Sequence, residues 1–316
     1  MAAALETVGL VSGALGIIQF FMDNLPGSAG PQGTAVNIKA GLSQIGDDVD
    51  NLGGTIAAVY GFNTFNEYIG QSDSKHINEA DYVTFTIDQS SPGEQADYIS
   101  VANNGDATCI SWISTEPSDS SKGGAWTGDI GAECGQRWHM GNQRAGDLPN
   151  NGGEYVPKCT WLDADFTDGT VSASLKFPIK AYGEKAEDTV AKSNQCGSTI
   201  FGKDNGPIAG QPATKRSAPP ARPQWIIDRL VMSNITNQNA EELCSSETSW
   251  GPDFCGVDGK CCDMDTKTLF PLCEFEDVDG CVEVDANAKT MVKRSSVARR
   301  TVEKVHKSYK TVTHNS

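Results

Sequence analysis

Ten cysteines are the residues whose type and spacing most directly predict chemistry in this chain of 316 residues. No Cys-x-x-Cys pair occurs, and His139 is the only histidine between the first and the last cysteine, so the spacing does not fit a zinc site. An even number of cysteines at this density predicts disulfide bonds formed in an oxidising compartment. The sequence alone leaves their pairing open. The cysteines are Cys109, Cys134, Cys159, Cys196, Cys244, Cys255, Cys261, Cys262, Cys273 and Cys281.

The acidic run DADFTDG is a second candidate site, in which Asp163, Asp165 and Asp168 place oxygen donors close together before a glycine. This order resembles a calcium-binding loop, so calcium is the one cofactor for which the sequence offers ligands. The run departs from the calcium-loop pattern by one residue, and no glutamate follows at the position that would bind the ion through both oxygens. A turn stabilised by aspartate side chains explains the same residues.

Aromatic and histidine side chains form a third candidate. We expect Trp126, Trp138 and His139 to lie on loops and to form a ligand-binding surface on which sugar rings stack. Tryptophans of a sheet protein also serve as core residues, and this alternative stays open for these two and for Trp112 and Trp161.

Patterns that would indicate catalysis are weaker than those that indicate binding. The nucleophile pattern G-x-S-x-G and the phosphate-binding patterns G-x-x-x-x-G-K-[ST] and G-x-G-x-x-G are absent. The abundant carboxylates would permit a carboxylate-dependent hydrolase of polysaccharides, but no pair of acids stands out from the rest. The sequence therefore identifies no catalytic residue and favours a binding protein over an enzyme.

Charge is distributed unevenly along the chain. There are 41 acidic and 25 basic residues, which give a net charge of −16 at neutral pH. Such a surface repels phosphates, so nucleic acid is not an expected partner. Residues 291–316 differ, because they hold seven bases and one acid. Since this stretch is basic and has few core-forming residues, we predict that it is a disordered tail.

Several features predict export and processing. Asn234 begins the sequon Asn-Ile-Thr, a glycosylation site in secreted chains. The pairs Lys215-Arg216 and Lys293-Arg294 are candidate processing sites, provided that they lie in flexible, accessible segments. Residues 1–33 contain an apolar stretch that fits three descriptions: a helix packed on the domain, an atypical secretion signal, or a segment that contacts a membrane.

Alternating apolar residues predict a mainly β fold. Val83, Phe85 and Ile87 share one face of a predicted strand, and the same period of two recurs in 171–177. Asn104-Gly105 tolerates positive φ and predicts a hairpin turn between two such strands. Short strands separated by frequent turns favour an antiparallel β-sandwich over alternating strands and helices.

Composition divides the chain into five parts. Residues 225–290 contain six cysteines, and their 14 acids outnumber four bases, which predicts a small acidic module held by disulfides. The five predicted parts are an N-terminal apolar helix and linker (1–33), a β-sandwich domain (34–201), a Pro/Gly linker with a dibasic site (202–224), the acidic cysteine-rich module (225–290) and the basic disordered tail (291–316).

Five stretches combine cysteine, tryptophan and glycine at a distinctive spacing: ETVGLVSGALGIIQF, CISWIS, AWTGDIGAECGQRW, VPKCTWLDAD and CCDMDTKTLFPLC. In these stretches, which span most of residues 6–285, the chain resembles a largely uncharacterised family of fungal secreted cysteine-containing proteins. The resemblance implies fungal origin and export, and it carries over no catalytic residue. The chain departs from many members of the family because no clear signal peptide precedes Glu6.

These features together predict a secreted, extracellular fungal protein that recognises a cell-wall polysaccharide or a host protein, in the manner of a virulence effector. One alternative is a secreted carboxylate-dependent hydrolase that acts on polysaccharide. The other is a membrane-active toxin that contacts the bilayer through its N-terminal helix.

Overall fold

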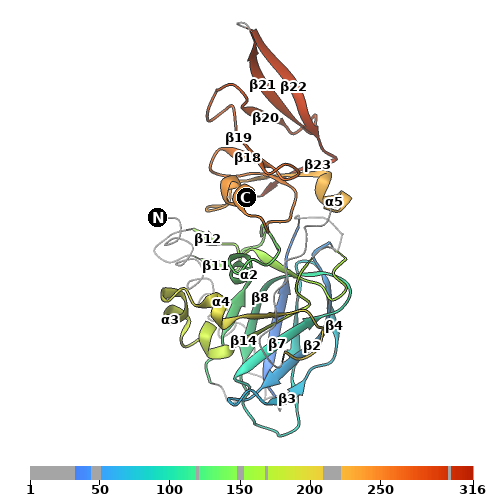
Figure 1. Cartoon of the computed structure of the whole chain (residues 1–316), viewed down its shortest axis with the longest axis vertical. Coiled ribbons are helices and arrows are strands. Elements are labelled where there is room, and N and C mark those ends of the chain that lie inside the picture. The colour runs from blue at the N-terminus through green and yellow to red at the C-terminus, as the bar shows by residue number, and fades with distance from the viewer. Residues whose placement is uncertain are drawn as a thin grey trace. The chain divides into compact units, whose positions relative to one another are not determined.

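The computed structural model describes residues 33–43, 51–118, 121–147, 153–167, 170–208, 222–297 and 300–315. They form a mainly β fold with several antiparallel sheets and a few short helices (Figure 1). The chain divides into two compact units, the N-terminal unit Met1–Pro220 and the C-terminal unit Ala221–Ser316. The predicted N-terminal helix, Asp168 and Lys215-Arg216 lie outside the described residues.

The first sheet of the N-terminal unit has the strand order β10-β13-β8-β1-β5, and β9 pairs with β8. All these pairings are antiparallel. The predicted alternation around Phe85 is confirmed, because Phe85 and Ile87 are buried while Thr84 and Thr86 are exposed. The strands are β1 (Ala35–Ala40), β5 (Tyr82–Thr86), β8 (Thr108–Glu116), β9 (Ala125–Thr127), β10 (Trp138–His139) and β13 (Cys159–Leu162).

The second sheet has the order β15-β14-β7-β2-β3-β6, and β4 pairs with β2. These pairings too are antiparallel. Its strands are β2 (Gly54–Phe62), β3 (Tyr68–Gln71), β4 (Lys75–Ile77), β6 (Asp88–Gln89), β7 (Tyr98–Asn103), β14 (Ser174–Pro178) and β15 (Ile200–Gly202). In β14, Leu175 and Phe177 belong to the hydrophobic cluster, but Ser174 and Lys176 between them are buried too, so burial does not alternate along this strand as predicted.

The predicted hairpin at Asn104-Gly105 is wrong. Strand β7 belongs to the second sheet and β8 to the first, so the turn carries the chain from one sheet to the other. The side chain of Asn103 explains this course. Its Nδ2 donates to the carbonyls of Asp106 (2.7 Å) and Leu162 (2.8 Å), and its Oδ1 accepts from Thr108 Oγ1 (2.7 Å). A buried side chain that satisfies several backbone groups at once replaces the ladder bonds that a hairpin would make.

Both sheets contribute side chains to one hydrophobic cluster. Ile38 and Phe85 come from the first sheet, and Val101 and Phe177 come from the second. Two disulfides brace this unit: Cys109–Cys159 joins β8 to β13, and Cys134–Cys196 ties the end of α2 to α4. Its shorter elements are α2 (Gly128–Glu133), β11 (Gly146–Asp147), β12 (Glu154–Tyr155), η2 (Ile179–Tyr182), α3 (Ala186–Ala191) and α4 (Gln195–Ser198).

The C-terminal unit contains one sheet of five strands, in the order β19-β18-β17-β16-β23, and one of three, β20-β21-β22. Strand β16 is parallel to both β17 and β23, and the other pairings are antiparallel. Its elements are α5 (Gln224–Ile227), β16 (Arg229–Ser233), α6 (Ala240–Ser245), β17 (Asp253–Cys255), β18 (Lys260–Asp263), β19 (Thr268–Pro271), β20 (Val282–Asp285), β21 (Thr290–Val297), β22 (Arg300–Ser308) and β23 (Thr311–Asn315).

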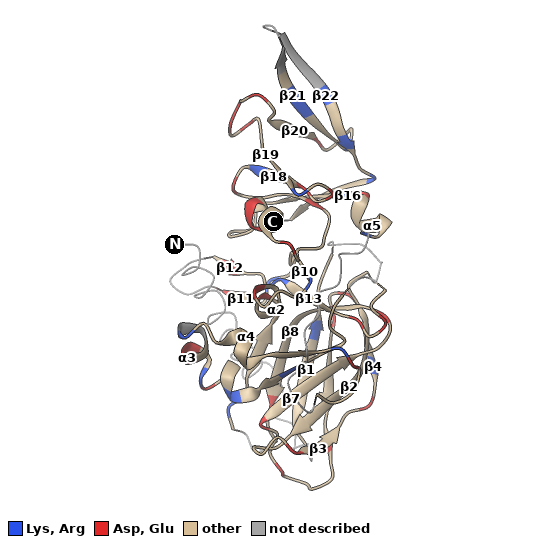
Figure 2. Cartoon of the chain, in the orientation of Figure 1, with Lys and Arg blue, Asp and Glu red and all other residues tan. Residues whose placement is uncertain are grey.

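The disordered tail that the composition predicts for 291–316 is replaced by strands β21, β22 and β23. Figure 2 shows Lys and Arg on β21 and β22, and Asp and Glu elsewhere in the C-terminal unit. Lys307 Nζ lies 2.7 Å from a carboxylate oxygen of Asp253, 2.9 Å from Asp263 and 2.5 Å from Asp265. The hydroxyl of Tyr309 donates to Asp253 at 2.9 Å. Lys307 and Tyr309 thus tie this stretch to carboxylates of the module.

Lys293 and Arg294 lie in β21, which pairs with β20 on one side and β22 on the other. Arg294 also contacts Glu283 Oε2 at 2.5 Å. A processing protease requires an extended, accessible segment. Because β21 is paired on both sides, Lys293-Arg294 does not lie in the flexible segment that the predicted processing requires.

Candidate functional site

The three residues predicted to bind a ligand are buried. Trp126, Trp138 and His139 are 0%, 2% and 3% exposed, and they lie in strands β9 and β10 rather than on loops. Trp126 belongs to the hydrophobic cluster of the two sheets. A sugar ring stacks only on an aromatic face that solvent can reach. The predicted binding surface is therefore wrong, and the core alternative holds for both tryptophans.

The predicted calcium ligands act in local turns. Asp163 Oδ1 accepts the backbone N–H of Asp165 (3.1 Å), and Asp165 Oδ1 accepts that of Thr167 (3.0 Å). Hydrogen bonds from the side chain and the backbone N–H of Thr167 lower the pKa of the Asp165 carboxyl below its usual value. Within the described ranges, no group of three or more His, Cys, Asp or Glu residues could hold a metal ion. The structure thus supports the turn explanation for this run.

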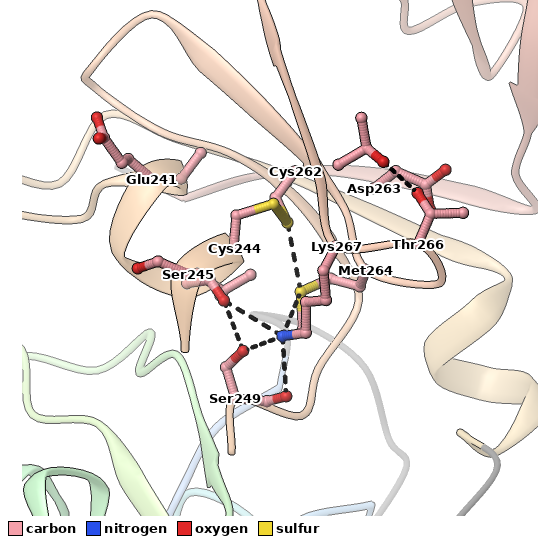
Figure 3. The surroundings of a disulfide bond; sticks show 12 residues. Glu241, Cys244, Ser245, Ser249, Cys262, Asp263, Met264, Thr266 and Lys267 are labelled. Atoms are coloured by element: carbon pink, nitrogen blue, oxygen red, sulfur yellow. Dashed lines mark hydrogen bonds between the residues drawn. A yellow bond between two sulfur atoms is a disulfide. The ribbon is translucent and has the colours of Figure 1, made fainter. Parts of the chain in front are cut away.

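All ten cysteines form disulfides, which confirms the predicted oxidised state. The pairs in the C-terminal unit are Cys244–Cys262, Cys255–Cys261 and Cys273–Cys281. Beside Cys244–Cys262, the amine of Lys267 donates to Ser249 Oγ and to the carbonyl of Leu243 (Figure 3). Ser249 Oγ in turn donates to Leu243 O at 2.6 Å and is 5% exposed. Ser249 is therefore buried and engaged by Leu243 and Lys267, whereas a nucleophilic hydroxyl would need access to a substrate.

Asn234 has an exposed side chain directly after β16. Its backbone N–H donates to the carbonyl of Asn315 at 2.8 Å, which fixes the position of the sequon. An exposed asparagine is what glycosylation requires. Glycosylation of this residue stays a prediction.

The outer face of the second sheet carries three aromatic side chains in line, called here the aromatic row: Tyr68, Phe62 and Tyr98. Tyr68 on β3 pairs with Phe62 on β2, and Phe62 pairs with Tyr98 on β7. Pro178 on β14 continues the line beyond Tyr98. Neighbouring residues of β3, β7 and β14 belong to the hydrophobic cluster, and successive side chains of a strand point to opposite faces. The aromatic row therefore points away from the core.

Two exposed aromatic rings, one in the aromatic row and one in the neighbouring turn, are accessible to a ligand. Tyr68 is 52% exposed, and its ring centroid lies 6.2 Å from that of Phe62, which supports it from the buried side. Phe65, in the turn between β2 and β3, is 80% exposed. Asn63 Oδ1 orders this turn by accepting the N–H groups of Phe65 and Glu67, each at 3.0 Å. The exposed rings are thus held by local structure rather than by contact with the core.

A cleft of about 510 Å³ adjoins the aromatic row. Tyr98 and Pro178 belong to its lining, and so does Thr64 of the β2–β3 turn. Figure 1 shows α3 and α4 close together, and η2, which follows β14, contacts both β14 and α3. The charged side chains of the cleft are Asp97, Lys180, Lys185, Asp188 and Lys192.

Ion pairs organise these cleft side chains. Lys180 Nζ lies 3.3 Å from Asp97 Oδ1, and Lys192 Nζ lies 3.5 Å from Asp188 Oδ2. Thr64 Oγ1 also donates to the Asp97 carboxylate. The two carboxylates are therefore held by cations, an arrangement that suits binding better than the acid and base pair of a glycosidase.

Lys176 stiffens the floor of the site. This side chain is 3% exposed, and its amine donates to Asn66 Oδ1 (2.6 Å) and to the carbonyl of Ile208 (2.8 Å). The amine also lies 3.2 Å from the centroid of the Phe62 ring, a cation–π contact. Burial lowers the pKa of Lys176 to about 8. Through these contacts Lys176 joins the β2–β3 turn to the aromatic row.

The aromatic row and the cleft are absent from the sequence-based predictions. A usable signal is Phe65, an apolar residue between Asn63 and Asn66 in a stretch whose composition is typical of a turn. An aromatic residue at a position that cannot be buried is more informative about binding than a tryptophan within a strand. The cleft has no such signal, because its lining residues come from three separate segments of the chain.

Comparison with known proteins identifies no relative: no family model matches the chain, and no curated protein is significantly similar to it. The resemblance to a fungal secreted family therefore stays a prediction. Among the described residues, no helix is long and apolar enough to cross a membrane.

Proposed function

We propose that this chain is an exported binding protein that recognises a polysaccharide of a cell wall or host surface. The binding surface comprises Phe65, the two tyrosines of the aromatic row and the adjoining cleft, and the buried Phe62 supports Tyr68 from below. In this proposal the two sheets of the N-terminal unit form a β-sandwich, and the outer face of the second sheet is its binding face.

The observation that carries the proposal is an ordered, exposed aromatic surface that continues into a polar cleft. Tyr68 and Phe65 offer ring faces on which pyranose rings stack, and Tyr98 leads to the cleft. The ion-paired side chains Asp97 and Lys180 offer acceptors and donors to sugar hydroxyls. Exposed aromatic rings next to polar groups are typical of binding surfaces.

Export is supported by the chain's covalent chemistry. Five disulfides involve all ten cysteines, a pattern typical of proteins that fold in an oxidising compartment. The exposed sequon at Asn234 agrees with passage through a secretory route. An extracellular location and a host-interaction role follow from this proposal if the bound polysaccharide belongs to a host.

The test is retention of the purified protein on a panel of insoluble wall polysaccharides. Tyr68→Ala should weaken retention on the bound polysaccharide roughly tenfold, the equivalent of one lost stacking contact. Tyr82→Ala is the matched control, because Tyr82 is 46% exposed but lies on β5 of the first sheet. Equal retention of both variants, with unchanged far-ultraviolet circular dichroism, would remove the proposed surface.

A further inference from the structure

The cleft beside the aromatic row carries more positive than negative charge. Lys180, Lys185 and Lys192 belong to its lining, against Asp97 and Asp188. The chain as a whole has a net charge of −16. A locally basic cleft on an acidic protein attracts anionic ligands.

Lys185 is the lysine of the cleft best placed to bind an anionic group of a ligand. Within the described part of the chain, its amine has no hydrogen-bond or ion-pair partner. Its backbone is nevertheless ordered, since its N–H donates to the carbonyl of Lys180 at 2.8 Å. Nearby acids Glu184 and Glu187 do not belong to the lining of the cleft. A ligand carboxylate would supply the charge-assisted hydrogen bond that this amine lacks.

The other two lysines can change partner at little cost. The side chains of Lys180 and Lys192 are 51% and 70% exposed, and each is paired with an aspartate. Surface ion pairs of this kind contribute at most about 1 kcal/mol. A bound carboxylate can therefore share either ammonium group without dismantling the cleft.

Neutral and anionic polysaccharides make different use of this arrangement. A neutral chain would stack on Tyr68 and Tyr98 but would bring no counter-charge to Lys185. A polysaccharide chain with carboxylate groups would both stack on the tyrosines and neutralise the charge of the lysines. The acidic surface elsewhere in the N-terminal unit would disfavour other positions for such a chain on this unit.

We propose that the ligand is a polyuronate, a polymer of pyranose rings that carry carboxylates. Its rings stack on Tyr68 and Tyr98, and its carboxylates are bound by Lys185 with Lys180 and Lys192. This proposal rests on the proposed function, since it names the class of polysaccharide bound at the same site.

The test compares two probes with the same backbone, polygalacturonate and its fully methyl-esterified form, which is neutral. The full-length protein should bind polygalacturonate and bind the ester at least tenfold more weakly. Binding of polygalacturonate should weaken as salt is raised. Lys185→Gln should lower the affinity for polygalacturonate about two- to fivefold.

Lys203→Gln is the matched control for the loss of one positive charge. Lys203 is exposed and follows Gly202, which pairs with Ser174 at the end of β14 opposite to Pro178. The affinity of the Lys203→Gln variant for polygalacturonate should equal that of the wild type. An equal effect of the two substitutions would show a general charge effect and would overturn the assignment of Lys185.

Two further outcomes separate this inference from the proposed function. Equal binding of polygalacturonate and its ester, or binding of a neutral wall polysaccharide alone, would overturn the polyuronate and leave polysaccharide binding intact if Tyr68→Ala still weakens it. Failure to bind any polysaccharide of the panel would overturn both proposals.

Discussion

Among the described residues, a hydrophobic cluster of the N-terminal unit contains 22 buried residues, whereas a cluster of the C-terminal unit contains 8. The N-terminal unit has two disulfides, which join residues 50 and 62 positions apart. The C-terminal unit has three, across 6, 8 and 18 positions. The C-terminal unit also has a buried network of ion pairs, in which Asp253 contacts both Arg222 and Lys307. One unit is thus stabilised mainly by apolar burial, and the other by covalent bonds and charge.

This difference bears on function. A large core shared by two sheets leaves the outer face of the second sheet free to carry exposed rings such as Tyr68. The C-terminal unit uses its polar side chains to hold itself together, as the contacts of Lys307 show. Binding is therefore expected from the unit whose stability does not depend on its polar surface.

The largest expected effect separates the two units by reduction. In the chain-entropy account, the three bridges of the C-terminal unit contribute about 8 kcal/mol in total, as much as the whole stability of many domains. The two bridges of the N-terminal unit contribute a similar amount, but its larger core remains. Hydrogen exchange with and without reductant should show loss of protection in β16–β23 first. Loss of protection in both units together would contradict the comparison.

A core substitution in the N-terminal unit should have the next largest effect. Trp126→Ala should destabilise this unit by about 3–5 kcal/mol, because Trp126 is fully buried and its removal leaves a cavity. Thermal unfolding followed by near-ultraviolet circular dichroism measures this. A variant of wild-type stability that fails to bind polysaccharide would restore Trp126 as a contact residue and contradict the core assignment.

In the C-terminal unit the matching substitution is Lys307→Met. It should cost roughly 3–4 kcal/mol, because Asp253 and Asp263, 1% and 4% exposed, would each lose a charged partner. Lys310→Met is the control, since its single pair with Asp228 is at the surface and contributes less than about 1 kcal/mol. Denaturant unfolding compares the two variants. Equal midpoints would show that the charge network does not stabilise the unit.

The smallest effect is a pH dependence confined to the N-terminal unit. Burial lowers the pKa of Lys176 to about 8 from the ordinary 10.5, so the unfolded chain binds more protons between these values. The stability of this unit should therefore rise as pH increases from about 8 towards 10.5, by at most about 3 kcal/mol. Lys176→Met should abolish this rise relative to wild type. A wild type and variant with parallel stability curves across this range would contradict the lowered pKa.

Local patterns predict those parts of the fold that depend on neighbouring residues. The alternation at Phe85 and the oxidation of the cysteines are examples, because strand periodicity and cysteine content are local or compositional. The burial of Trp126 depends on the packing of two sheets. The order of residues 291–315 depends on acids some 40 positions earlier, such as Asp263. A sequence pattern within one segment therefore predicts neither the burial of Trp126 nor the ordered C-terminal strands.

The candidate site shows the same limit. Phe65 has a local signal, since an apolar residue in an asparagine-rich turn has no core to enter. Tyr68 and Tyr98 become neighbours of one ring, Phe62, only through the register of β2 with β3 and β7. Lys185 joins the cleft through η2 and α3, two short elements with no strong periodicity.

Hydrogen exchange of the full-length protein with and without saturating polygalacturonate tests the binding face most directly. Protection is predicted in residues 62–68 and 178–185, which contain the exposed rings and the cleft lysines, while β9 and β10 should exchange as they do in the free protein. Ligand-dependent protection centred on β9 and β10, with residues 62–68 unaffected, would contradict the account and move the site back to the buried tryptophans.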